Sequence, residues 1–215
     1  MTEQVKNKKR FLVLIPLIGV LIFVVLYVIA AYLYPGGSQA DKNAIGFSWV
    51  NNYWCNLLNQ NAINGKPNSG RPMALGGMVV LCLTISSFWL IFPGFIKFNK
   101  SIRLVIKISG LLSMTIALFL FTKYHDIVIN LASIIGSIAI IGTFAGLYKI
   151  KWFTLFWFGI FNLFLVVLNN YVYYTKGLIV YLPVIQKISF VSFLIWLCCI
   201  DINMYNQQSV RYNVS

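Results

Sequence analysis

Acidic side chains are almost missing from this sequence, which has four Asp and Glu residues and one histidine against 17 Lys and Arg. Charged residues make up 10% of the chain, whereas soluble domains contain roughly a quarter. This scarcity excludes an ordinary soluble domain and leaves few groups for acid–base catalysis. The scattered His, Asp and Cys residues show no metal-ligand spacing, and no phosphate loop, dinucleotide fingerprint or Cys-x-x-Cys motif is present. The sequence therefore predicts no metal and no cofactor.

Hydrophobic residues, at 60% of the chain, gather in six long runs. Each run can cross about 30 Å of hydrocarbon as a helix, and a helix satisfies its own backbone hydrogen bonds in lipid. The first run, at about 23 residues, is longer than the apolar part of a cleaved signal peptide. We predict an all-α polytopic membrane protein, a six-transmembrane-helix bundle that forms one membrane domain over residues 1–215. The predicted spans are residues 11–33, 73–95, 104–121, 127–149, 152–173 and 182–202.

The net charge of +13 is high enough to suggest a nucleic-acid partner. The basic residues instead flank the apolar runs, which predicts membrane lipids as the surroundings and no nucleic acid. Clusters before the first span, after the second, and between the fourth and fifth fall on one side of a six-span chain. Because Lys and Arg favour short cytoplasmic loops, both termini are predicted to be cytoplasmic. Usage rich in Lys, Asn and Ile fits an AT-rich bacterium.

The connection at residues 34–72 is the one long loop, and it is predicted to lie outside the cell. Between Phe47 and Asn61 its residues alternate with helical spacing. One face carries Phe47, Val50, Trp54, Leu57 and Leu58, and the other carries Ser48, Asn51, Asn52, Cys55 and Asn59. The pattern predicts a short amphipathic helix that packs over the mouth of the bundle, with aromatic side chains downward and amides upward.

Polar residues recur at helical spacing inside two of the predicted spans. The fourth span carries Asp126, Asn130, Ser133 and Ser137, and the fifth carries Asn162, Asn169 and Tyr173. Their matching depth suggests an outward-facing polar pocket between the two spans. Hydrogen bonds that only bridge helices are the other interpretation of the same residues. For the pocket, the predicted ligand-binding residues are Asp126, Asn130, Asn169, Arg71 and Trp54.

His125 is the sole histidine and adjoins Asp126 at the start of the fourth span. With a supporting carboxylate it could serve as a general base, and Ser38 or Ser69 could then be a nucleophile. Adjacent helical residues point about 100° apart, so we expect Asp41, in place of Asp126, to be the partner of His125. A polar pair without a catalytic role is the competing interpretation, and whether the protein is an enzyme stays open.

Two glycines and two cysteines in the predicted spans also have recognisable spacings. Gly142 and Gly146 have the spacing that allows close contact between membrane helices. Cys198 and Cys199 are adjacent near the predicted inner surface, where palmitoylation is one interpretation and ordinary helix packing is the other.

Several short segments resemble a family of uncharacterised bacterial six-span membrane proteins, a domain of unknown function that is distantly similar to the DRAM/Sfk class. The resemblance implies a six-span fold with a structured loop after the first span and a place in the bacterial inner membrane, and it implies no reaction. It covers at most the first four spans. The segments are Tyr34-Pro35-Gly36-Gly37-Ser38, Gly46-Phe47-Ser48-Trp49, Asn52-Tyr53-Trp54-Cys55-Asn56-Leu57, Arg71-Pro72 and His125-Asp126.

These patterns are compatible with three functions. The favoured one is a non-enzymatic membrane protein that binds a lipid headgroup or small ligand in the outward-facing pocket. The second is an extracytoplasmic hydrolase or transferase that uses His125 with Asp41 or Asp126. The third is a small transporter, although no paired halves or broken spans are evident.

Overall fold

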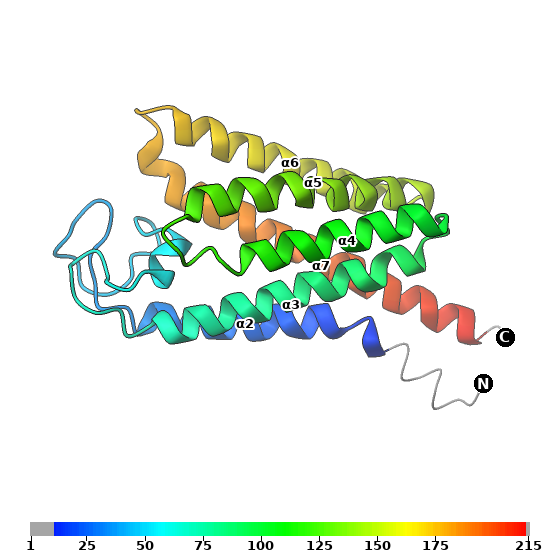
Figure 1. Cartoon of the computed structure of the whole chain (residues 1–215), viewed down its shortest axis with the longest axis horizontal. Helices are drawn as coiled ribbons and strands as arrows, with labels where there is room; N and C mark the ends of the chain where they lie inside the picture. The colour runs from blue at the N-terminus through cyan, green and yellow to red at the C-terminus, as the bar shows by residue number, and fades with distance from the viewer. Residues whose placement is uncertain (1–10, 214–215) are drawn as a thin grey trace. The chain divides into compact units, whose positions relative to one another are not determined.

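The computed structural model describes residues 11–213, with side chains described as far as Gln207. Helices are the main regular elements of the described chain, and the long, mostly irregular loop contains two isolated β-bridges (Figure 1). Its elements are α2 Ile15–Tyr32, η1 Trp54–Leu58, α3 Arg71–Phe95, α4 Lys100–Ala117, α5 His125–Lys149, α6 Phe153–Tyr174, η2 Ile179–Tyr181 and α7 Leu182–Asn213.

The chain divides into two compact units. Unit 1 contains Val80–Phe158 together with the described residues up to Leu21 and from Ile195 onward. Unit 2 contains Ile22–Val79, which includes the long loop, and Gly159–Leu194. Four helices, α2, α3, α6 and α7, contribute residues to both units.

Five helices are long and apolar enough to cross a membrane, namely α2, α3, α5, α6 and the helical segment Ile179–Gln207 that includes most of α7. Much of their apolar surface is exposed, as in Leu21 and Val25 of α2, and such a surface suits lipid better than water. These findings confirm an all-α membrane protein. Four of the predicted spans agree with the observed helices within a few residues, and α7 continues well beyond residue 202.

Helix α4 departs from the predicted span at residues 104–121. It begins at Lys100 and ends at Ala117, after which the chain forms turns. Its first turns carry Lys100, Arg103 and Lys107, which keep it outside the set of five. The predicted span began and ended four residues too late, because it was placed on the apolar run alone and left out the basic residues of the first turns. The basic residues can belong to the helix because their long side chains reach beyond its end.

In unit 1, α3, α4 and α5 pack through small residues. A Cβ on Gly110 of α4 would lie 2.5 Å from the ring of Trp89 on α3. The indole of Trp89 also contacts α5, because its Nε1–H donates to Thr143 Oγ1 at 3.3 Å. Gly142 of α5 faces Ile106 of α4, and Gly146 of α5 faces α3. The two glycines therefore permit close helix contact, as predicted, although they face different helices.

The contacts also fix the directions of these three helices. Trp89 meets Thr143, and Phe92, further along α3, meets Gly146, further along α5, so α3 and α5 run parallel. Helix α4 runs antiparallel to α5 beside it (Figure 1), since Ser113 Oγ donates to Ala132 O at 2.7 Å while the earlier Ile106 meets the later Gly142.

The amphipathic helix predicted between Phe47 and Asn61 was wrong. The chain there forms turns and the five-residue η1, seen within the cyan loop of Figure 1. The predicted faces hold only in part: Leu57 and Leu58 are buried and Asn59 is exposed, whereas Asn52 and Asn56 are buried and Val50 is exposed. The amides are inside because an irregular backbone needs partners for its buried N–H and C=O groups.

Candidate functional site

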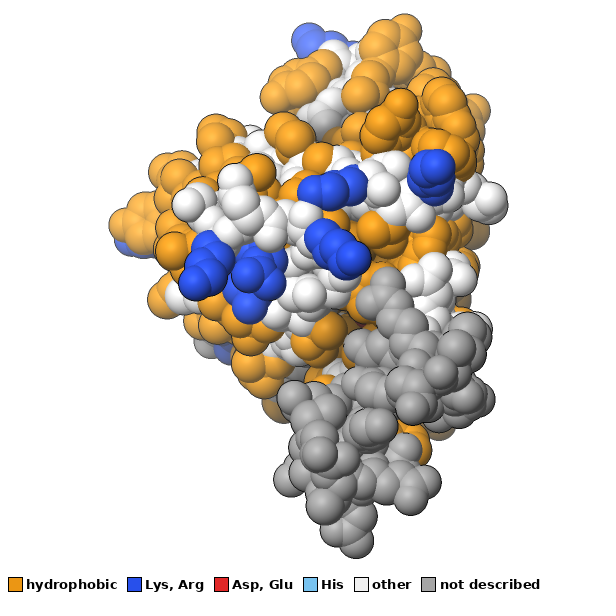
Figure 2. All heavy atoms as spheres, turned by 90° about the vertical axis from the view of Figure 1, so that its right-hand side faces the viewer, with side chains coloured by type: hydrophobic (Ala, Val, Ile, Leu, Met, Phe, Trp, Pro, Cys, Tyr) orange, Lys and Arg blue, Asp and Glu red, His pale blue; other side chains and the backbone are white. Residues whose placement is uncertain are grey.

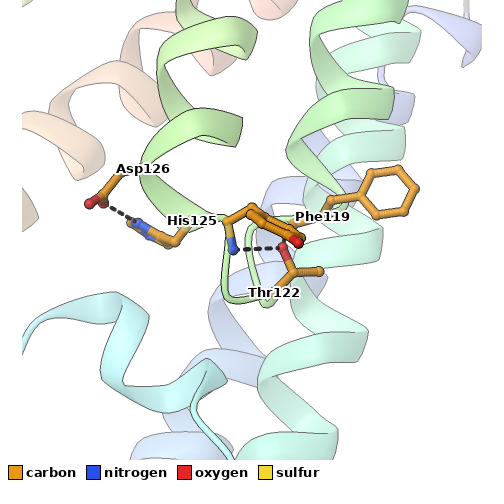
Figure 3. A network of polar contacts seen from close by, with 5 residues as sticks. Phe119, Thr122, His125 and Asp126 are labelled. Atoms are coloured by element: carbon orange, nitrogen blue, oxygen red, sulfur yellow. Dashed lines mark hydrogen bonds and ion pairs between the residues drawn. The ribbon is translucent and has the colours of Figure 1, made fainter.

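His125 and Asp126 contact each other at the first turn of α5, in unit 1 (Figure 3). The distance from His125 Nδ1 to Asp126 Oδ1 is 3.2 Å, so the expectation that adjacent residues would point apart was wrong. The reason is that the preceding residue Tyr124 is not helical and the side chains reach across the open helix start. The His125 N–H donates to Thr122 O at 3.2 Å, and Thr122 Oγ1 donates to Phe119 O.

The environment of this pair is solvated. Side-chain exposure is 37% for His125 and 88% for Asp126, so water screens the pair. Asp126 also lies in the first turn of α5, where the helix dipole favours a negative charge. The geometry allows an exposed ion pair, while catalysis would further require a substrate cleft and a nucleophile.

Of the other residues proposed for catalysis, Ser69 is exposed, and Asp41 and Ser38 form hydrogen bonds within the loop of unit 2. Asp41 Oδ1 accepts a hydrogen bond from Asn43 N at 2.8 Å. Ser38 is buried, and its Oγ accepts from Asp41 N at 3.0 Å and donates to Asp41 O. These bonds close a turn, which is the ordinary structural use of Ser and Asp in loops.

The polar stripe of α5 is exposed along its length. Asp126, Asn130, Ser133 and Ser137 are all exposed. The buried face of α5 is instead made mainly of small residues, which include Ala132, Gly136 and Ala139. Small residues occupy that face because α4 packs closely there. Asp126 and Asn130 belong to unit 1, whereas Asn169, Arg71 and Trp54 belong to unit 2, so the pocket predicted from all five stays a prediction.

Trp54 joins the loop to the helices of unit 2. Its ring lies 5.2 Å from Tyr27 of α2 and 6.0 Å from Phe190 of α7, between ring centroids. Its backbone N–H donates to Gln186 Oε1 at 3.4 Å. The indole Nε1 is buried and has no hydrogen-bond partner among the described residues. Trp54 is therefore an aromatic anchor with one unused donor.

Whereas Trp54 has an unused donor, Asn169 of α6 has an unused acceptor. Its Oδ1 is buried without a hydrogen-bond partner in the described part of the chain, whereas the adjacent Asn170 is exposed and its Nδ2 donates to Val166 O. Tyr53, the neighbour of Trp54, lies close enough to Tyr173 for electrostatic interaction. Burial raises the pKa of Tyr53, with smaller contributions from Cys55 and Tyr173. This interaction brings the start of η1 near the end of α6.

Lys187 of α7, which was not singled out from the sequence, has a specific place in the structure. Its Nζ donates to Asn52 O and to Pro183 O, and lies 5.8 Å from the ring centroid of Phe47. Arg71 has a similar use, since its Nε donates to Leu58 O at 3.0 Å. The sequence signal for Lys187 was a lone lysine in an apolar run.

Asp201 of α7, in unit 1, was missed. Its side chain is fully buried, at 0% exposure, and both carboxylate oxygens lack a partner among the described residues. A carboxylate in an apolar run was visible in the sequence, and such residues mark functional sites more often than others do.

No protein-family model, curated protein or solved structure matches this chain. The resemblance to the six-span bacterial family therefore stays a prediction. The geometry of the described residues is the basis on which a function can be proposed.

Proposed function

We propose that the protein is a multi-pass membrane protein that binds a phospholipid headgroup, or a small ligand of the same chemistry, at the outer loop of unit 2. The observation that carries this proposal is the pair of unused buried polar atoms, Trp54 Nε1 and Asn169 Oδ1. A buried polar group without a partner costs about 1–3 kcal/mol. A ligand that supplies an acceptor to the indole and a donor to the amide would remove both costs.

The chemistry required is that of a phospholipid headgroup. A phosphoryl oxygen accepts from an indole N–H, and an ammonium or hydroxyl group donates to an amide oxygen. Lys187 supports an anionic component, because an ammonium has three donors and two of them serve Asn52 O and Pro183 O. The exposed apolar surfaces of α2 and α6 would accommodate acyl chains.

We further propose that α4 is a sixth crossing, in a bacterial inner membrane with both termini cytoplasmic. The parallel course of α3 and α5 supports six spans, because the chain must return between them and α4 runs in the opposite direction. The charges at one end of unit 1, the end that carries the α3–α4 and α5–α6 connections, support this orientation. Lys and Arg side chains gather there, and no described Asp or Glu is visible on that face (Figure 2).

The test is the lipid content of purified full-length variants, measured by native mass spectrometry. Trp54→Phe keeps the ring and removes the donor, and Asn169→Ala removes the acceptor. We expect each to reduce copurified phospholipid, whereas the exposed Trp49→Phe and Asn170→Ala controls retain it. Loss of one buried hydrogen bond should weaken binding about tenfold. Lipid content equal to that of the controls would refute the proposal.

A further inference from the structure

Asp201 is the one described carboxylate that water does not reach. The other two described acids, Asp41 and Asp126, are exposed and accept hydrogen bonds. Asp201 is flanked in α7 by the buried residues Ile200 and Met204. An ionised carboxylate placed there without a partner would lose its hydration and gain nothing in return. The geometry therefore disfavours a permanent charge.

Within the part of the chain that the structure describes, the segments packed against this part of α7 supply no cation to neutralise Asp201. The segment just before α2 lies beside it, since the rings of Phe11 and Tyr205 are 6.5 Å apart. The start of α6 does as well, because Trp196 Nε1 donates to Leu155 O at 2.7 Å. Residues 11–21 and 153–158 contain no ionisable side chain.

Helix α5 also reaches α7 through Phe144 and Trp196, and its last turns carry Tyr148 and Lys149. The Nζ of Lys149 is directed to Lys97 O and to the ring of Phe98. On α7 itself, the ionisable neighbours within about one turn of Asp201 are Cys198, Cys199 and Tyr205. None of these groups forms a hydrogen bond or ion pair with Asp201 in the described part of the chain.

We propose that Asp201 is a proton-binding site, a carboxylic acid that is neutral in the folded protein and exchanges its proton through the nearer end of α7. The exposed polar residue Asn206 lies five residues, or about 8 Å, further along the helix. This path is short enough for occasional entry of water. The site lies in unit 1 and is independent of the headgroup site proposed for unit 2.

A carbodiimide tests the protonation state directly. The acid proton moves to a carbodiimide nitrogen, and the carboxyl oxygen bonds to the central carbon. Acyl transfer from oxygen to nitrogen then gives a stable N-acylurea. No atom leaves, so the labelled peptide gains the whole mass of the reagent. Ionised carboxylates in water do not take this course, which separates Asp201 from Asp126.

The experiment treats the full-length protein in detergent with dicyclohexylcarbodiimide over a pH series and maps the adduct by peptide mass spectrometry. We expect labelling at Asp201, none at Asp126 or Asp41, and loss of the adduct in Asp201→Asn. Labelling should fall about tenfold for each pH unit once the acid ionises. Mapping on the unmodified protein needs no variant, so the test holds even if Asp201→Asn fails to fold.

Two results would overturn the proposal. One is an unlabelled Asp201 throughout the pH series in folded protein. The other is labelling that NaCl suppresses at constant pH while choline chloride does not, because this would make Asp201 a sodium ligand. A folded Asp201→Asn should melt close to the unmodified protein, since the amide matches the neutral acid in size and charge.

Discussion

Asn68 should govern the stability of the outer loop. Its buried Nδ2 donates to Leu57 O at 2.9 Å and to Asn59 O at 3.1 Å, and its Oδ1 accepts from Gly70 N at 3.0 Å. Asn68→Ala would remove these three bonds, together with a longer one to Asn56 O at 3.5 Å, and would leave Leu57 O, Asn59 O and Gly70 N without that partner. At about 1 kcal/mol for each bond, local opening should become easier by about 2–3 kcal/mol, or about 30- to 150-fold.

Hydrogen exchange of the loop amides, followed by mass spectrometry in detergent, measures this change. Exchange in residues 52–70 should accelerate by that factor, while exchange in α5 stays unchanged because α5 belongs to unit 1. Asn59→Ala is the matched control, because its side chain is exposed. Equal exchange in the two variants would show that Asn68 does not hold the loop. Faster exchange throughout the chain would show that the loop does not open independently.

Two other predictions test packing and ionisation. Gly110→Ala should lower stability by about 1–3 kcal/mol, because its Cβ would overlap the ring of Trp89; the control Gly76→Ala, whose Cβ has open space, should keep the thermal midpoint or raise it. The Tyr34 hydroxyl accepts a hydrogen bond from Ile63 N at 3.0 Å, and burial raises its pKa. As the pH rises above 10, the tyrosine therefore loses its proton in the unfolded chain before it does so in the folded loop, and the loop should lose stability. Tyr34→Phe should abolish that alkaline step in a near-ultraviolet titration, and a step that persists would assign it to another group.

The exposed apolar surface explains why membrane helices were predictable. Lipid imposes a length and a composition on each helix separately, so residues 73–95 and 127–149 could be placed without knowledge of their neighbours. The displaced prediction at residues 104–121 has a local cause. Helix α4 combines a basic first half with an apolar exposed face, and hydropathy alone indicates only the apolar residues.

The outer loop shows why local periodicity was insufficient. The spacing of Phe47, Val50 and Trp54 is helical, yet Asn52 bonds to Gly37 O and Trp54 bonds to Gln186 of α7. These partners are distant in the sequence, and their hydrogen bonds outweigh the weak intrinsic stability of an isolated short helix. Lys187 could not be assigned its place for the same reason, since its acceptor on Asn52 is supplied by the folded loop.

Composition and hydropathy by themselves determined that this is an all-α membrane protein, because transfer of each apolar run from water to lipid depends on that run alone. Tertiary structure alone decided that the α5 polar stripe is exposed, that Trp54 and Asn169 have unused hydrogen-bonding atoms, and that Asp201 is sealed from water. Burial and hydrogen-bond partnership are properties of a residue's neighbours in space, and those neighbours come from other helices.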